Sequence, residues 1–255
     1  MGSKTGDERL SQAKFTTIAH RDHTILNPIS LEKIDRLFSL LDLPSGARVI
    51  DVGCGKAERL VRLIGRFGCT AIGLDSNPHF LAEARARAFD QGVAGELELL
   101  EGDVTRMKLA TETFDAALCV GATHAYGDLA TTLKSLRALV KPGGKVIVGE
   151  GLWMQKPDMN YLKALGSKLT DYTDHAGNVS AGIAEKLTYL YSVVADRDDF
   201  DHYEGLYNRA VETWCLENPR DLDMAAARER IRAWRETYLK WGRDTLGFAI
   251  YLFQK

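Results

Sequence analysis

Two glycines that follow an acid at the end of an apolar segment are the first candidates for chemistry in this sequence. Residues 48–60 read RVIDVGCGKAERL, with Asp51 before Gly53 and Gly55. The apolar pattern is that of a strand before the glycines and of a helix after them. Glycines at such a turn leave main-chain N–H groups open, and the helix start adds further unpaired donors. The segment therefore predicts a turn on which a ligand can rest.

The spacing separates two classes of cofactor. A dinucleotide fingerprint needs G-x-G-x-x-G, but the third glycine position here is Glu58, whose carboxylate would oppose a pyrophosphate. The segment instead resembles motif I of the class I S-adenosylmethionine-dependent methyltransferases, D-x-G-x-G-x-G, with Ala57 in place of the last glycine. The resemblance implies S-adenosyl-L-methionine as the cofactor.

Strand and helix patterns alternate along the rest of the chain. Strands are expected in the segment that leads from Arg48 to Asp51, at 70–75, 97–103 and 114–120, in a fifth segment after the Pro-Gly-Gly turn at 142–144, at 187–195 and at 247–255. Helices are expected at 31–41, 60–67, 159–169, 198–217 and 222–241, and after Asn77 and Asp128. Short right-handed crossovers then give a parallel sheet with its site at the carboxyl ends of the strands.

The family resemblance completes this fold prediction, because its plan has a last strand that enters antiparallel. We predict an α/β fold, a doubly wound, mostly parallel seven-stranded sheet of the Rossmann-like methyltransferase type with helical lid insertions. The KPGG block before the fifth strand is also familiar in this family. The chain is expected to form one methyltransferase domain over 1–255. Its parts are an N-terminal arm and helix (1–45), a cofactor-binding core (46–150), a lid insertion (151–186) and C-terminal strands and helices (187–255).

Acids close the second and third strands, where a nucleoside would lie. Asp75 is placed to accept hydrogen bonds from both ribose hydroxyls, a role shared by several nucleoside cofactors. In the family that the chain resembles, an acid after the third strand contacts the adenine amino group, and the next backbone N–H contacts a ring nitrogen. The resemblance implies Asp103 and Val104 for these two roles.

Two residues at the ends of the fourth and fifth strands are candidates for proton chemistry. His124 lies in the segment GATHAYGD, where this family commonly places groups that contact the substrate. It could accept a proton, or only orient a loop or the substrate. Glu150 could bind a cationic amine, act as a base, or hydrogen-bond a neighbouring backbone group.

Composition and net charge indicate which kinds of binding partner to expect. The chain has 255 residues, 45% of them hydrophobic, and a formal net charge of −2, which gives no electrostatic footprint for nucleic acid or anionic lipid. Its four cysteines are widely spaced, as in a cytosolic protein with reduced thiols, and no apolar run has membrane-spanning length. We expect a cytoplasmic enzyme with a small-molecule substrate and no nucleic-acid or membrane partner. A homodimer is compatible with this expectation.

The sequence hypothesis is an S-adenosylmethionine-dependent methyltransferase that transfers a methyl group to O or N of a small molecule by in-line displacement. The alternatives are a binding protein that keeps the fold without turnover and a nucleotide-cofactor oxidoreductase. The acids and histidines at 171–175 and 196–202 are expected to be solvated, so no metal site is predicted. The N-terminal arm is either a lid or a loosely packed terminus. The predicted site residues are His124 and Glu150 for catalysis; Asp51, Gly53, Cys54, Gly55, Asp75, Ser76, Asp103, Val104 and Gly121 for the cofactor; and His20, Tyr126, Trp153 and Tyr161 for the substrate.

Overall fold

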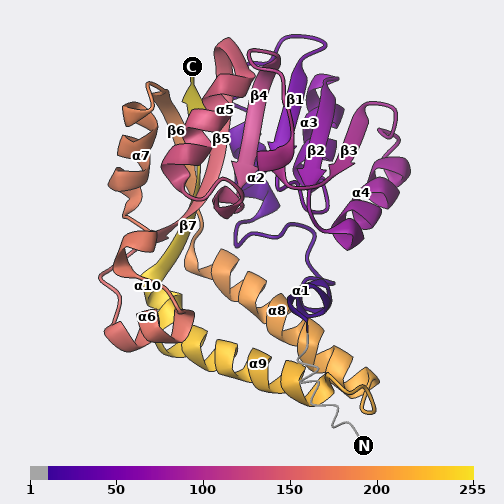
Figure 1. The fold of residues 1–255 in the computed structure, drawn as a ribbon, viewed down its shortest axis with the longest axis vertical. Helices are drawn as coiled ribbons and strands as arrows, with labels where there is room; N and C mark the ends of the chain where they lie inside the picture. The colour runs from indigo at the N-terminus through magenta and orange to yellow at the C-terminus, as the bar shows by residue number, and fades with distance from the viewer. Residues whose placement is uncertain (1–10) are drawn as a thin grey trace, which may run out of the picture.

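A seven-stranded sheet organises the chain in the computed structural model, which describes residues 11–255. The strand order is β3-β2-β1-β4-β5-β7-β6, and β7 is antiparallel to both of its neighbours (Figure 1). The strands are β1 (Arg48–Val52), β2 (Thr70–Asp75), β3 (Leu97–Glu101), β4 (Phe114–Val120), β5 (Val140–Trp153), β6 (Thr188–Val194) and β7 (Leu246–Gln254). The predicted fold class, including the antiparallel last strand, is confirmed.

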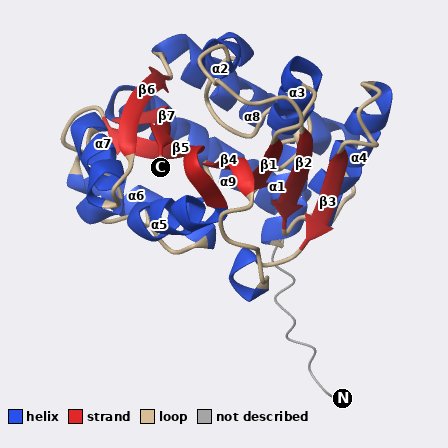
Figure 2. Cartoon of the chain, turned by 90° about the horizontal axis from the view of Figure 1, so that it is seen from above, coloured by secondary structure: helices blue, strands red, loops and turns tan. Residues whose placement is uncertain are grey.

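Helices cover both faces of the sheet and one of its ends. The helices are α1 (Gln12–Ala19), α2 (Leu31–Phe38), α3 (Glu58–Phe67), α4 (Pro78–Asp90), α5 (Leu129–Leu139), α6 (Met159–Leu165), α7 (His175–Ala184), α8 (Arg197–Glu217), α9 (Met224–Thr237) and α10 (Arg243–Thr245). Short turns of helix are η1 (Val104–Arg106), η2 (Thr123–Ala125), η3 (Leu169–Asp171) and the π-type η4 (Tyr238–Gly242). Helices α2, α3 and α4 pack on one face and α5 and α7 on the other (Figure 2).

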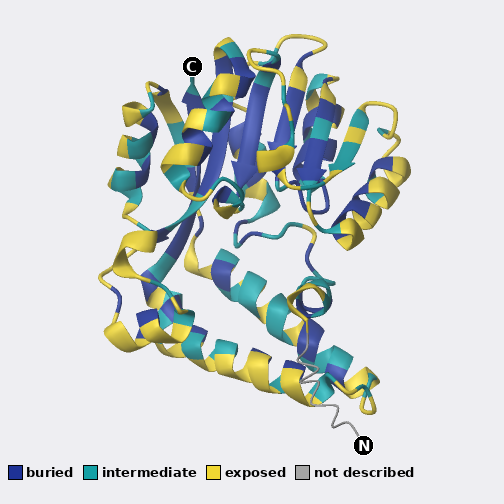
Figure 3. Cartoon of the chain, viewed as in Figure 1, coloured by how far each residue is buried: buried dark blue, intermediate teal, exposed yellow. Residues whose placement is uncertain are grey.

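Burial follows from this layered arrangement. Strands β1, β4 and β7 are buried along nearly their whole length because helices cover both faces of the sheet, and Figure 3 shows β4 in the dark blue of buried residues. Apolar residues accordingly follow one another without a break, as in 116–120, rather than in an alternating pattern. The two faces give two separate apolar clusters, one with Leu37 and Leu63, the other with Leu133 and Leu136. These clusters hold the carboxyl ends of the strands in fixed positions.

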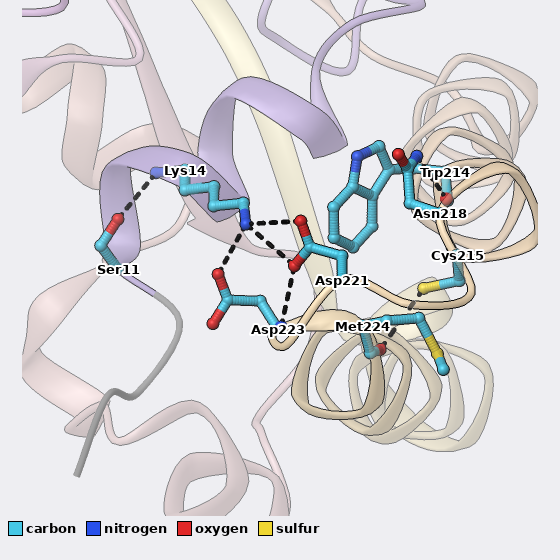
Figure 4. A network of polar contacts seen from close by, with 8 residues as sticks. All are labelled: Ser11, Lys14, Trp214, Cys215, Asn218, Asp221, Asp223 and Met224. Carbon is cyan, nitrogen blue, oxygen red and sulfur yellow. Dashed lines mark hydrogen bonds and ion pairs between the residues drawn. The ribbon is translucent and has the colours of Figure 1, made fainter. Parts of the chain in front are cut away.

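A separate helical layer lies beyond the carboxyl ends of the parallel strands. It consists of α1, α8 and α9, which pack through a small cluster of their own that includes Phe15, Val211 and Ile231 (Figure 1). Lys14 ties α1 to the turn between α8 and α9, because its Nζ donates to Asp221 Oδ1 at 3.0 Å and to Asp223 Oδ2 at 2.6 Å (Figure 4). The N-terminal residues that the structure describes are therefore a packed part of the molecule rather than a loose arm.

Several expected boundaries were wrong. The third strand ends at Glu101 rather than 103, since Asp103 leaves the sheet to cap η1 through the backbone N–H of Thr105. The Pro-Gly-Gly segment lies inside β5, where the pairing with β4 is irregular and the backbone of Gly143 and Gly144 bonds to Lys255.

The predicted lid insertion also needs correction. Residues 175–184 form α7, which packs on the sheet, although part of this segment was expected to be a polar loop over the site. Its apolar residues are too few and too small to show a helical pattern in the sequence, and burial against Phe253 is what supports the helix. Of the helices described in residues 11–255, none has the length and apolar character that a membrane crossing requires.

Close packing of α7 on β7 predicts opposite effects for two helical glycines. A Cβ added at Gly182 would lie 2.2 Å from Cε1 of Phe253. Gly205 is exposed on α8, and no heavy atom of residues 11–255 would lie within 4 Å of a Cβ added there. We expect Gly182→Ala to destabilise by about 1–3 kcal/mol through overpacking. Gly205→Ala is the matched control and should stabilise by about 0.5–1 kcal/mol, since alanine is the better helix former. Urea unfolding of both variants checks the signs; equal stabilisation would contradict the packing of α7.

A buried acid between α8 and α9 predicts how stability depends on pH. Burial raises the pKa of Glu204 from 4.5 to about 7, although Trp234 Nε1 donates to its Oε2 at 2.6 Å. The folded protein therefore holds this proton more tightly than the unfolded chain does. The resulting stability is complete below about pH 4.5 and is lost as pH rises through 7, by up to about 3 kcal/mol. Unfolding free energies from pH 4 to 8 check this, and Glu204→Gln should flatten that part of the profile.

Candidate active site

A cavity of about 760 Å³ lies between the carboxyl ends of β1 to β4 and the segment 12–27. The sheet contributes the turns that follow the four strands, and the N-terminal segment closes the opposite side. Of the predicted site residues, the cavity brings together Gly53, Cys54, Gly55, Asp75, Ser76, Asp103, Val104, Gly121, His124 and His20. Side chains from segments far apart in the sequence thus meet at the edge where ligands bind in open α/β sheets.

The turn after β1 has the bared backbone that its glycines predict. Gly53 and Gly55 have φ of +73° and +56°, which side chains disfavour. A Cβ at Gly53 would lie 2.3 Å from the Cβ of Ala122, so the turn also needs glycine for lack of space. Ala57, at the position where the family motif has glycine, takes a left-handed φ of +56° itself. Alanine therefore keeps the backbone shape of the motif at some cost in strain.

The end of β2 is joined to this turn. Asp75 Oδ2 accepts a hydrogen bond from the backbone N–H of Gly55 at 2.8 Å, and Oδ1 accepts one from Asn77 at 2.8 Å. Each oxygen keeps a further lone pair, because a carboxylate oxygen accepts more than one hydrogen bond. Asp75 therefore lines the cavity as an anchored, ionisable acceptor, which fits a ligand with two neighbouring hydroxyl groups.

Asp51 has a different position from the one expected. Its side chain is fully buried and is not part of the cavity wall. Its Oδ2 accepts from Arg59 Nε at 3.1 Å, and its Oδ1 has no hydrogen-bond partner among residues 11–255. Burial raises the pKa of Asp51, and Arg59 opposes that change. The expectation that Asp51 contacts the ligand is thus corrected: it lies one side chain away, behind Arg59.

Sequence reasoning missed Arg59 and Asn27. Arg59 is 5% exposed and lines the cavity; its Nη1 donates to Asn27 Oδ1 at 3.0 Å and its Nη2 to the carbonyl of Gly53 at 3.3 Å. The one signal in the sequence is the place of Arg59 in α3. This charged residue lies on the helix face that also carries the buried residues Leu60, Leu63 and Ile64. Nothing in the sequence pairs position 27 with it.

Lys56 holds the N-terminal segment in place through buried polar contacts. Its side chain is 2% exposed and pairs with Glu83 Oε2 at 2.7 Å, while Nζ also donates to the carbonyl of His20 at 2.9 Å. Burial, together with the charges of His23 and Lys56, lowers the pKa of His20 to about 3. His20 therefore presents a neutral ring to the cavity, beside the rings of Phe80 and Tyr207.

His124 and Glu150 differ in access to the cavity. His124 is exposed on η2 and lines it, whereas Glu150 does not. Glu150 Oε2 accepts from Thr123 Oγ1 at 2.5 Å, and Oε1 accepts from the backbone N–H of Gly151 at 2.8 Å. Burial raises the pKa of Glu150, and these bonds and the charge of His124 lower it. Of the roles considered for Glu150, the geometry favours a structural one, in which the carboxylate holds a neighbouring loop by hydrogen bonds.

The structure separates three expected substrate residues from the cavity. Trp153 and Tyr161 belong to an apolar cluster with Trp241 near α6 and α10, and Tyr126 packs on the core under α5. Within residues 11–255, no residue between 151 and 186 lines the cavity. The expectation that these aromatic residues and this insertion cover the site is therefore wrong. Trp153 and the insertion lie away from the cavity because β5 continues past the edge of the sheet. The covering segment is the N-terminal one.

No candidate metal centre emerges from the part of the chain that the structure describes. Its histidines, cysteines and acids do not form a group of three or more that could hold a metal ion.

Glu58, the residue that opposed a dinucleotide interpretation, lines the cavity and pairs with Arg62 and Arg87. The cavity therefore offers backbone donors and carboxylate acceptors for an organic ligand.

Comparisons with known proteins find methyltransferases among the proteins that this chain is similar to. A family model described as a methyltransferase domain matches residues 49–144. The Escherichia coli K12 protein YjhP, described as uncharacterized, is 30% identical over 240 residues, which are 93% of this chain and 96% of that protein. A sterol 24-C-methyltransferase of Gibberella zeae is 29% identical over 183 residues, 69% of this chain and 45% of that protein.

A solved structure extends the likeness to nearly the whole chain. The crystal structure of an S-adenosylmethionine-dependent methyltransferase from Geobacter sulfurreducens, in complex with S-adenosyl-L-homocysteine, is similar with a TM-score of 0.89 at 28% identity. The match covers 96% of this chain and 98% of that one, so it includes the helical layer as well as the sheet.

Proposed function

Because the chain belongs to the class I S-adenosylmethionine-dependent methyltransferases, we propose that it transfers a methyl group to O or N of a small molecule held in the 760 Å³ cavity. The observation that supports this most is the meeting of the bared turn at Gly53 and Gly55 with Asp75 and His124 around one cavity. Its volume is in the range of sites that hold a cofactor and a small ligand. The cofactor is S-adenosyl-L-methionine.

The order of the strands suggests how the cofactor would lie. Asp75 at β2 would accept from the ribose hydroxyls, and Asp103 with the N–H of Val104, beyond β3, would hold the adenine. Gly53, Gly55 and Gly121 would leave room for the rest of the molecule across β1 and β4. The cavity fits S-adenosyl-L-methionine because two acids lie at one end of it and exposed backbone groups lie at the other.

The protein's own contribution to the reaction would be alignment, exclusion of water and acceptance of a proton. When bound, S-adenosyl-L-methionine supplies an electrophilic methyl group on a sulfonium whose leaving group is neutral. The N-terminal segment, held by Lys56 and by Arg59, lines one side of the cavity and would keep water from competing with the methyl acceptor. His124, exposed at the cavity edge, would take the proton of a protonated O or N nucleophile.

Carbon is the second candidate for the accepting atom. The similarity to a sterol 24-C-methyltransferase is the observation that favours it, although the chain spans less than half of that protein. A binding protein without turnover is the remaining alternative. Incubation with labelled S-adenosyl-L-methionine and a panel of small phenols, amines and unsaturated lipids tests all three, since methylated product identifies the atom and S-adenosylhomocysteine reports turnover.

Asp75→Ala should weaken binding of S-adenosyl-L-homocysteine by about 10- to 100-fold or more, because hydrogen bonds to a charged acceptor contribute about 1.5–3 kcal/mol. Isothermal titration calorimetry measures the change. Glu101→Ala is the matched control, since Glu101 pairs with Asp75 in the register of β2 and β3 but does not line the cavity. Equal affinity of Asp75→Ala and the wild type would remove Asp75 from the cofactor site.

His124→Ala should lower turnover about 10²- to 10⁴-fold if the histidine accepts the proton, and should leave cofactor affinity within about twofold. Initial rates with a protic acceptor found in the panel, together with calorimetry, separate the two effects. His79→Ala is the control, because His79 is exposed on α4 outside the cavity. An unchanged rate would leave His124 without a catalytic role.

A further inference from the structure

A buried chain of three polar side chains links β1 to the N-terminal segment. Asp51 accepts from Arg59 Nε at 3.1 Å, and Arg59 Nη1 donates to Asn27 Oδ1 at 3.0 Å. Their exposed fractions are 0% for Asp51, 5% for Arg59 and 8% for Asn27. The Asp51 carboxylate fixes the guanidinium, and the guanidinium in turn fixes the amide of Asn27, which lies 24 residues before Asp51 in the sequence.

This chain determines which end of the Asn27 amide faces the cavity. A guanidinium only donates hydrogen bonds, so the amide oxygen must face Arg59 and the NH₂ group must point the other way. That group lies against the end of β4, since a Cβ built on Gly121 would be 2.0 Å from Asn27 Nδ2. Asn27 and Gly121 both line the cavity, and no side chain or carbonyl within residues 11–255 accepts from Nδ2. The structure thus presents an oriented donor to a ligand.

The position of Nδ2 identifies the part of the ligand that it meets. Asp75 and Asp103, at β2 and β3, occupy the nucleoside end of the cavity, whereas Gly121 follows β4 on the other side of β1. A cofactor whose nucleoside lies at β2 and β3 would extend its amino-acid arm over β1 toward β4. We propose that Asn27 Nδ2 donates a hydrogen bond to the α-carboxylate of that arm, with Arg59 and Asp51 as positioning residues. This inference rests on the proposed function.

Hydrogen-bond chemistry supports the carboxylate over the α-ammonium of the same arm. An NH₂ group donates hydrogen bonds and cannot accept one from an ammonium, and Arg59 keeps this group turned away from itself. Lys56, the other cation of the cavity wall, already bonds to Glu83, His20 and Arg21. Because Asn27 belongs to the N-terminal segment, the bond would also tie that segment to the bound cofactor.

The test compares two ligands that differ in the amino-acid arm. S-adenosyl-L-homocysteine carries the α-carboxylate, and 5′-deoxy-5′-methylthioadenosine has the same nucleoside without it. In Asn27→Asp the side chain still accepts from Arg59 but replaces the NH₂ donor by an anion. We expect calorimetry on the full chain to show about 10- to 100-fold weaker binding of S-adenosyl-L-homocysteine to this variant, and methylthioadenosine binding within twofold of the wild type.

Asn208→Asp is the matched control, since Asn208 also accepts from an arginine, Arg235, but on α8 outside the cavity. It should bind both ligands like the wild type. Unchanged affinity of Asn27→Asp for S-adenosyl-L-homocysteine would overturn the inference. Asn27 would then contact the methyl acceptor or only stabilise the fold. An equal loss for both ligands would also overturn it, because Asn27 would then only shape the cavity. Wild-type protein that binds neither ligand would instead refute the proposed function.

Discussion

The ion pair between Asp51 and Arg59 is the interaction on which the site depends. Both side chains are buried where β1 ends and α3 begins, directly under the turn with Gly53 and Gly55. Two charges are costly to remove from water, and such a pair is maintained only where further hydrogen bonds satisfy it. Arg59 makes these bonds to the carbonyl of Gly53 and to Asn27. One guanidinium therefore holds the glycine turn, the strand and the N-terminal segment together.

A second constraint is the cover over the strand ends. The sheet alone would leave the cavity open to water on one side, because its helices pack on the faces and not on the edge. Helix α1 closes this side, and α8 and α9 hold α1 through Phe15 and the Lys14 ion pairs. The chain thus uses its first described helix and the two helices near its end to complete a site whose chemistry lies in the middle of the sequence.

The loops at the ends of β4 and β5 show how position changes the role of a residue. Glu150 and His124 both belong to strand ends that face the same edge, and both looked suited to proton transfer. In the structure, the carboxylate of Glu150 accepts hydrogen bonds from Thr123 Oγ1 and from the backbone N–H of Gly151, so it supports the loop on which His124 is exposed. Trp153 lies farther along β5, beyond the edge, and stabilises α6 instead.

The sequence by itself determined the features that arise from local physics. Strand and helix periods, the glycines that need positive φ, and the acids that follow β2 and β3 are encoded within a few residues of each other, so the fold class and the side of the cavity at β2 and β3 were predictable. Tertiary structure alone decided the rest. The contacts of Asn27 with Arg59, of Lys56 with the end of α1, and of α1 with α8 join segments that lie far apart in the chain. Their geometry depends on how the layers pack, and no local pattern in the sequence records it.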